Sequence, residues 1–169
     1  MDLLTAFPRT CFLFNLIAVG VLFACPAMSQ TPAPPPDTLI TLQRGACEKR
    51  CAVYRLVIFA DGTVIYEGRF NVRRTGLIKG AVTPEALIKL VQNLEAAGFH
   101  DLEANYGYGN RDHCASWNSD GPEAIVSLAS GGLSKTVLHD HRCISPATQR
   151  LSEMEDWIDQ AVGVAKWIR

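Results

Sequence analysis

Two histidines, His139 and His141, stand two positions apart in a segment that reads as a β-strand. Because successive side chains of a strand point to opposite faces, both imidazoles should lie on the same face. Neutral imidazole nitrogens bind zinc and copper, and His113 could complete a cluster of three. The same histidines could instead be hydrogen-bonded residues with a structural role. The sequence therefore leaves a metal site at His113, His139 and His141 open, and it identifies no cofactor.

Four cysteines that follow the N-terminal apolar segment could form disulfides or serve as redox thiols. Of the possible pairings we expect Cys47 with Cys51 and Cys114 with Cys143. The second pair flanks a predicted hairpin, and closing a loop of this length should stabilise the fold by about 3 to 4 kcal/mol in the chain-entropy model. A redox-active Cys47–Cys51 pair is less favoured, because thioredoxin-like chemistry normally uses a two-residue spacing at a helix N-terminus.

Three aromatic residues, Tyr106, Tyr108 and Trp117, are spaced by glycines and polar residues in a long irregular stretch from Phe99 to Pro122. Loops of this length are usually functional or mobile. The three side chains could form an adaptable contact surface of the kind that is enriched at protein interfaces. They could equally pack beneath the loop as a small satellite core.

Signatures of catalysis are missing from the sequence. It contains no Gly-x-Ser-x-Gly elbow, no His-Glu-x-x-His pair and no glycine loop that could cradle phosphate. With 16 basic and 17 acidic residues and a formal charge of −1, the chain shows no electrostatic footprint for nucleic acid or an anionic membrane. We therefore expect a non-enzymatic exported module that binds an envelope protein or a cell-wall component. The alternative hypothesis is a periplasmic metal-binding protein that uses His113, His139 and His141.

The N-terminus predicts export. Residues 1–29 read as a signal peptide, because the apolar run from Cys11 to Ala24 is shorter than the roughly 20 residues of a membrane span. Cleavage before Gln30 would release a periplasmic or secreted protein. The sequence around Cys25 also resembles a lipobox, so a lipoprotein anchored at Cys25 is an alternative, and an uncleaved anchor is a third. Contact with the membrane is expected only through this segment or that lipid.

Residues 30–37 are rich in proline and predict an extended tether, so that residues 38–169 form a single domain. A strand is expected at 38–43. Asp61-Gly62 between two β-rich runs, Tyr54–Ala60 and Thr63–Phe70, predicts a hairpin with a two-residue turn. That turn would place Phe59 opposite Val64 and Ile58 opposite Ile65, so that Ile65 shares a face with Leu56.

The second half of the domain repeats this alternation. A Thr-Pro and a Ser-Pro pair, each followed by apolar residues at helical spacing, predict helices over 84–97 and 146–162. Gly131-Gly132 predicts a second hairpin of Glu123–Ser130 and Leu133–Asp140. The order is strand, hairpin, helix, hairpin, helix. We expect an α+β fold with an antiparallel sheet of about five strands and two amphipathic helices on one face.

Two elements at a fixed separation carry a resemblance to a known family. The first is Arg-Gly-x-Cys-x3-Cys-x2-Tyr, from Arg44 to Tyr54, and the second is Asp-Gly-x3-Tyr-x-Gly, from Asp61 to Gly68. Together they resemble a family of exported bacterial domains of unknown function, over about residues 38–169. Lys49 and Ala52 stand where similar sequences tend to have Gly and Pro. The resemblance implies an exported α+β module without a known activity.

Overall fold

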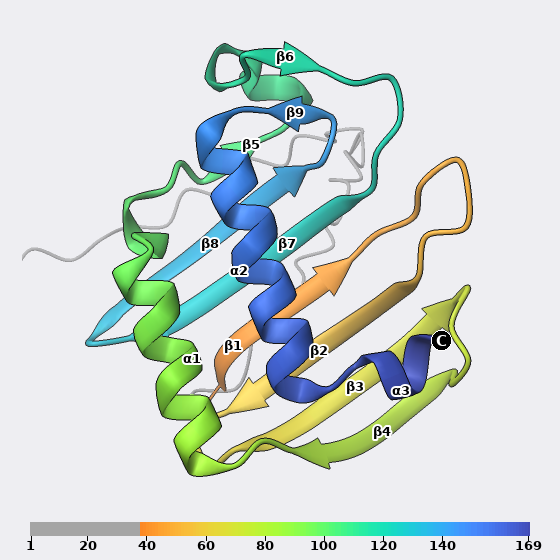
Figure 1. Ribbon diagram of the computed structural model, residues 1–169, viewed down its shortest axis with the longest axis vertical. Coiled ribbons are helices and arrows are strands. Elements are labelled where there is room, and N and C mark those ends of the chain that lie inside the picture. The colour runs from red at the N-terminus through yellow and green to blue at the C-terminus, as the bar shows by residue number, and fades with distance from the viewer. Residues whose placement is uncertain (1–37) are drawn as a thin grey trace, which may run out of the picture. The chain divides into compact units, whose positions relative to one another are not determined.

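The computed structural model describes Thr38–Arg169. The predicted signal peptide, the lipidation alternative at Cys25 and the tether over 30–37 lie outside the described residues. A seven-stranded sheet carries helices α1 (Pro84–Ala96) and α2 (Pro146–Val162) on one face (Figure 1). The strands in sheet order are β4 (Gly76–Ala81), β3 (Thr63–Phe70), β2 (Val53–Phe59), β1 (Thr38–Arg44), β7 (Glu123–Ser130), β8 (Leu133–Asp140) and β5 (Asn105–Tyr106).

The smaller elements lie outside this sheet. Strands β6 (Ser116–Trp117) and β9 (Cys143–Ile144) pair with each other as a separate ribbon. Short helices are η1 (Phe99–Asp101), η2 (Tyr108–His113) and, at the C-terminus, α3 (Ala165–Ile168). None of the helices among residues 38–169 is both long and apolar enough to cross a membrane.

The α+β class and the two helices on one face are as expected, but the main sheet has seven strands instead of about five. Strand β4 was missed because its sequence contains Gly76 and Gly80, which weaken the β signal. It is held by pairing with β3 along its whole length. Strand β5 has two residues and pairs in parallel with β8, which is too short for a pattern in the sequence to indicate.

The first hairpin has a register one residue away from the predicted one. Ile58 pairs with Val64, not with Ile65. The cause is a three-residue turn, in which the Gly62 N–H donates to the Phe59 carbonyl at 3.0 Å and Gly62 has φ 83°.

This shift changes which side chains face the helices. Val64 and Tyr66, and not Ile65, join Leu56 on the buried face. The second hairpin turns as predicted, with Ser130 opposite Leu133.

Both helices begin at the predicted residues because their caps are satisfied. The Thr83 hydroxyl accepts from the Ala86 N–H at the start of α1. At the start of α2, Ser145 and Thr148 form a reciprocal capping box, in which each side chain accepts from the other residue's N–H. The core lies between these helices and the sheet. Its fully buried members include Ile40, Leu42, Leu56, Ile58, Val64, Leu94, Val126, Leu128, Val137, Leu151, Met154 and Ile158.

Both predicted disulfides are present. Cys47 pairs with Cys51 and Cys114 with Cys143, with Cα atoms 5.6 and 5.1 Å apart. Disulfides form and persist in oxidising compartments, so the two bridges indicate an oxidising environment outside the cytosol.

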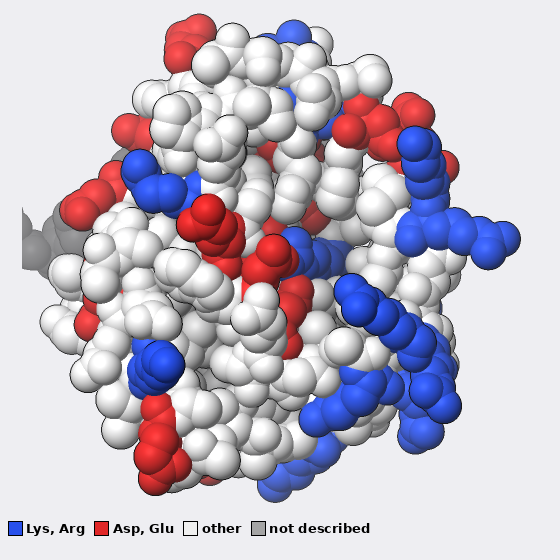
Figure 2. All heavy atoms as spheres, viewed as in Figure 1, with Lys and Arg blue, Asp and Glu red and all other residues white. Residues whose placement is uncertain are grey.

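The near-zero formal charge hides an uneven distribution. Figure 2 shows lysine and arginine side chains gathered on the side of the molecule where Figure 1 places β3, β4 and α3. Acidic side chains, in contrast, cluster over the middle of α2. The total charge of the chain therefore does not describe the local charge of its surface.

Candidate functional site

A buried ion network joins the end of strand β1 to helix α2. Arg44 is the last residue of β1 and follows Ile40 and Leu42 on the face that packs against the helices. Its guanidinium donates to Glu155 Oε2 at 2.6 Å and to Asp159 Oδ2 at 2.7 Å. Glu155 is fully buried, so this contact lies inside the protein.

The two predicted histidines meet the same carboxylate. His139 Nδ1 lies 2.7 Å from Glu155 Oε1, and His141 Nε2 lies 3.0 Å from Oε2. Since Glu155 is ionised, both nitrogens must be N–H donors. The rings stack with centroids 4.0 Å apart. The prediction that His139 and His141 share a face is confirmed.

The third predicted ligand is elsewhere. His113 is exposed and places its ring 6.2 Å from that of Tyr106. Among the residues that the structure describes, the group that could hold a metal ion is formed by His139, His141 and Glu155, whose ligand atoms all lie within 4.8 Å of one another. Sequence reasoning missed Glu155, although a signal existed. It lies four residues after Leu151 and three before Ile158, so it is an acid on the buried face of α2.

The electrostatics of the network follow from burial and neighbouring charge. Burial alone would raise the pKa of Glu155, but the hydrogen bonds from His139 and His141 and the charge of Arg44 lower it to about 2. For Asp159 the balance is reversed, and burial raises the pKa in spite of Arg44. Burial and the adjacent Asp159, which accepts the Tyr54 hydroxyl proton at 2.7 Å, raise the pKa of Tyr54.

As it stands, the network is a closed set of hydrogen bonds. Glu155 accepts from one guanidinium and two imidazoles, which leaves little of its acceptor capacity free. A metal ion would have to replace the two imidazole protons. The donor set of two nitrogens and one oxygen nevertheless suits zinc, which in proteins is often bound by three side chains and a water.

A second candidate site stands on the long loop. The Arg111 guanidinium lies 4.1 Å from the centre of the Tyr108 ring and 4.4 Å from that of Trp117. Arg142 lies 5.2 Å from the Trp117 ring. We call Tyr108, Arg111 and Trp117 the aromatic platform. Tyr106, the third predicted contact residue, does not belong to it. It is 3% exposed and packs in the core, and its hydroxyl accepts from the Glu103 N–H.

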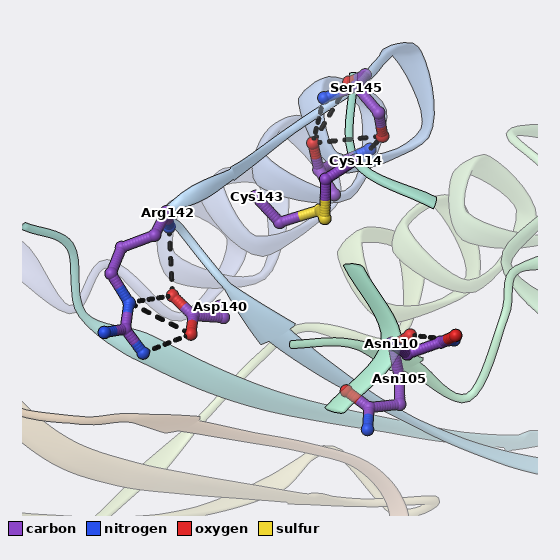
Figure 3. Close-up of a disulfide and its surroundings, with 8 residues drawn as sticks. Asn105, Asn110, Cys114, Asp140, Arg142, Cys143 and Ser145 are labelled. Carbon is purple, nitrogen blue, oxygen red and sulfur yellow. Dashed lines mark hydrogen bonds and ion pairs between the residues drawn. A yellow bond between two sulfur atoms is a disulfide. The ribbon is translucent and has the colours of Figure 1, made fainter. Parts of the chain in front are cut away.

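The disulfide Cys114–Cys143 holds this platform in place. It joins η2 to β9, and Trp117 pairs directly with Cys143 in the β6–β9 ribbon. Figure 3 shows Arg142 turned back onto Asp140, which it meets through two guanidinium nitrogens, with Nε 2.8 Å from Oδ1. These contacts fix the position of the Arg142 guanidinium, which lies near the Trp117 ring.

The model of a family described as a domain of unknown function (DUF6438) matches residues 38–162 of this chain. The matched segment contains the ion network and the aromatic platform. No curated protein matches the chain.

Proposed function

We propose that this chain, which belongs to the DUF6438 family of domains of unknown function, is a non-enzymatic binding module of the bacterial envelope. Its partner is a protein, which it contacts through the aromatic platform. The observation that carries the proposal is the contact of the Arg111 guanidinium with the two rings of Tyr108 and Trp117, which themselves meet edge to face with centroids 6.4 Å apart, while Tyr108 is 71% exposed.

The chemistry of the platform favours a protein partner. Tyrosine, tryptophan and arginine are the residue types most enriched at the energetic centres of protein interfaces. Contact with two rings restrains Arg111, so binding would cost little side-chain entropy. Among residues 38–169, Arg111 forms no ion pair. Its N–H groups are therefore available for a carboxylate of the partner.

Site-specific photocrosslinking in cells tests this proposal. A benzophenone amino acid replaces Tyr108 in the full chain, and a matched variant carries it at Leu133, which is 60% exposed at the tip of the second hairpin. We expect one discrete protein adduct from position 108 and not from position 133. Adding Arg111→Ala to the position-108 variant should reduce the adduct strongly.

Three outcomes would contradict the proposal. These are the same adducts from both positions, an adduct unaffected by Arg111→Ala, and crosslinking of position 108 to cell-wall glycan instead of protein. The last outcome would replace the protein partner by a cell-wall component.

The group His139, His141 and Glu155 supports a second candidate function, the binding of a transition metal ion. Its support is the convergence of three ligand atoms within 4.8 Å. Isothermal titration of chelator-treated protein with zinc should show one site in the wild type and in His113→Gln, and none in His139→Gln. Zinc binding that survives His139→Gln, or that requires His113, would contradict this assignment.

A further inference from the structure

A cationic cleft lies between the β3–β4 turn and the C-terminal helix α3, away from both sites described above. It has a volume of about 360 Å³ and is lined by Arg73, Arg74, Ile78, Lys166 and Trp167. It falls on the side of the molecule where Figure 2 shows basic side chains gathered. Strand β4 lies at the edge of the sheet opposite to β5, the strand that directly precedes η2 of the aromatic platform in the chain.

No carboxylate lines this cleft. Within residues 38–169, moreover, Arg73, Arg74 and Lys166 form no ion pair. Three like charges around one hollow repel one another, and an anion placed between them relieves that repulsion. The arrangement therefore has the charge that binding an anion requires.

The backbone of the cleft is fixed by hydrogen bonds. The Arg74 N–H donates to the Trp167 carbonyl at 2.9 Å. The Tyr66 hydroxyl donates to the Arg74 carbonyl at 3.1 Å. The backbone of Arg74 is thus held by hydrogen bonds at both its N–H and its carbonyl, although its side chain is exposed.

The indole of Trp167 forms the floor. It packs on the Tyr66 ring, with centroids 4.8 Å apart. Gly80 allows this approach, because a β-carbon at that position would come within 3.1 Å of the indole. The Lys166 ammonium lies 4.4 Å from the centre of the same indole. That ammonium also donates to the Val162 carbonyl at 3.4 Å. The cleft therefore has an aromatic floor with three cationic side chains around it.

We propose that this cleft binds a phosphate group. A guanidinium presents a planar fork of N–H donors that matches two phosphate oxygens, and a lysine ammonium adds a compact point charge. Arg73 and Arg74 with Lys166 would thus contact a phosphate from two sides, while Trp167 packs against whatever the phosphate is attached to. In an envelope protein the phosphate could belong to a lipid headgroup or to a free phosphorylated molecule.

The test is a ligand titration of the protein, in which nitrogen–proton NMR reports the chemical shifts of the amides. One arm uses inorganic phosphate, and the other uses vesicles of phosphatidylcholine with and without phosphatidylglycerol. We expect saturable shifts confined to the amides around Arg74 and Lys166 and to the Trp167 indole N–H. Saturation by inorganic phosphate identifies a free phosphate ligand. Binding only to the phosphatidylglycerol vesicles identifies a lipid headgroup.

The variant Arg73→Gln/Arg74→Gln keeps the backbone hydrogen bonds of the cleft and removes two charges. It should weaken binding by about tenfold or more in whichever arm binds, because charge-assisted hydrogen bonds are lost. The matched control, Lys89→Gln/Arg150→Gln, removes two exposed charges from α1 and α2. Equal weakening by both variants would show a general charge effect and overturn the cleft. Failure of both arms to bind the wild type would also overturn it.

Discussion

Arg44 and Glu155 form an ion pair of 2.6 Å between the end of a central strand and the buried face of a helix. They lie 111 positions apart in the chain. The guanidinium also reaches Asp159, one turn further along α2. This contact fixes the position of the helix over the sheet and brings Glu155 to the histidines.

Removing the cation of this pair should strongly destabilise the fold. In Arg44→Met the buried Glu155 carboxylate loses its counter-charge, so we expect a loss of about 3 to 5 kcal/mol in the free energy of unfolding. Urea denaturation measures it. The control is Arg69→Met, which removes a largely exposed pair with Glu67 and should change stability by about 1 kcal/mol or less. Similar effects of the two substitutions would show that the Arg44 pair contributes no more than a surface pair.

Stability should fall in acid because of Glu155. Its pKa drops from 4.5 to about 2 on folding. A carboxyl group whose pKa is lower in the folded than in the unfolded state stabilises the fold at pH values above the unfolded pKa. That contribution is lost as the pH falls from 4.5 toward 2. The shift corresponds to about 3 kcal/mol. Asp159, whose pKa is raised on folding, partly offsets this loss.

Urea unfolding with EDTA present, at several pH values between neutral and strongly acidic, measures this effect. Glu155→Gln cannot titrate at this position, so it should lose less stability over this range than the wild type, although it starts from a lower value. A wild-type curve parallel to that of Glu155→Gln would refute the assignment. Asp156→Asn, at an exposed position that meets Arg44 at 3.2 Å, serves as the matched control.

The bond between Cys114 and Cys143 should contribute most of the disulfide stabilisation. It closes a loop with a sequence separation of 29, against 4 for Cys47 and Cys51. Cys143→Ser should therefore cost about 2 to 5 kcal/mol, and Cys51→Ser clearly less. Thiol titration of the mature protein without reductant should find no free thiol at these four positions. Free thiols at 114 and 143 in stable protein would contradict this prediction.

The turn of the first hairpin depends on Gly62. Its φ is 83°, and a β-carbon there would come within 2.6 Å of the Val82 carbonyl oxygen. Gly62→Val should lower the free energy of unfolding by about 1 kcal/mol or more. Gly109→Val is the matched control, because Gly109 has open space around it. Equal melting temperatures for the two variants would mean that the turn is not constrained as described.

Local signals in the sequence predicted the helices well. Thr83-Pro84 and Ser145-Pro146 combine an N-cap with a residue fixed in helical φ, so both starts were visible without tertiary information. The first hairpin shows the limit of such signals. Asp-Gly is compatible with a two-residue and with a three-residue turn, and the packing of Val64 and Tyr66 against the core selects the second.

The candidate site was predictable only in part. His139 and His141 were expected on one face, and both rings contact Glu155, although β8 ends at Asp140 and His141 lies in the turn that follows it. Their partner Glu155 comes from a helix, and its position depends on how α2 lies over the sheet. His113 precedes Cys114, which bonds to Cys143 close to His141, but a bond between neighbouring residues does not decide where a side chain points. Arg73 and Arg74 were not predicted to form a site, because the total charge of a chain adds its positive and negative surface regions together.

The place of β1 in the sheet has a consequence for how the domain folds. This first strand pairs with β2 on one side and with β7, far along the chain, on the other. The middle of the sheet is therefore complete only after β7 has been synthesised. The ion pair between Arg44 and Glu155 forms later still, because Glu155 lies in α2. Long-range pairings of this kind slow folding. A nascent chain built in this way cannot complete its sheet during most of its synthesis, which is compatible with the predicted export of an unfolded polypeptide.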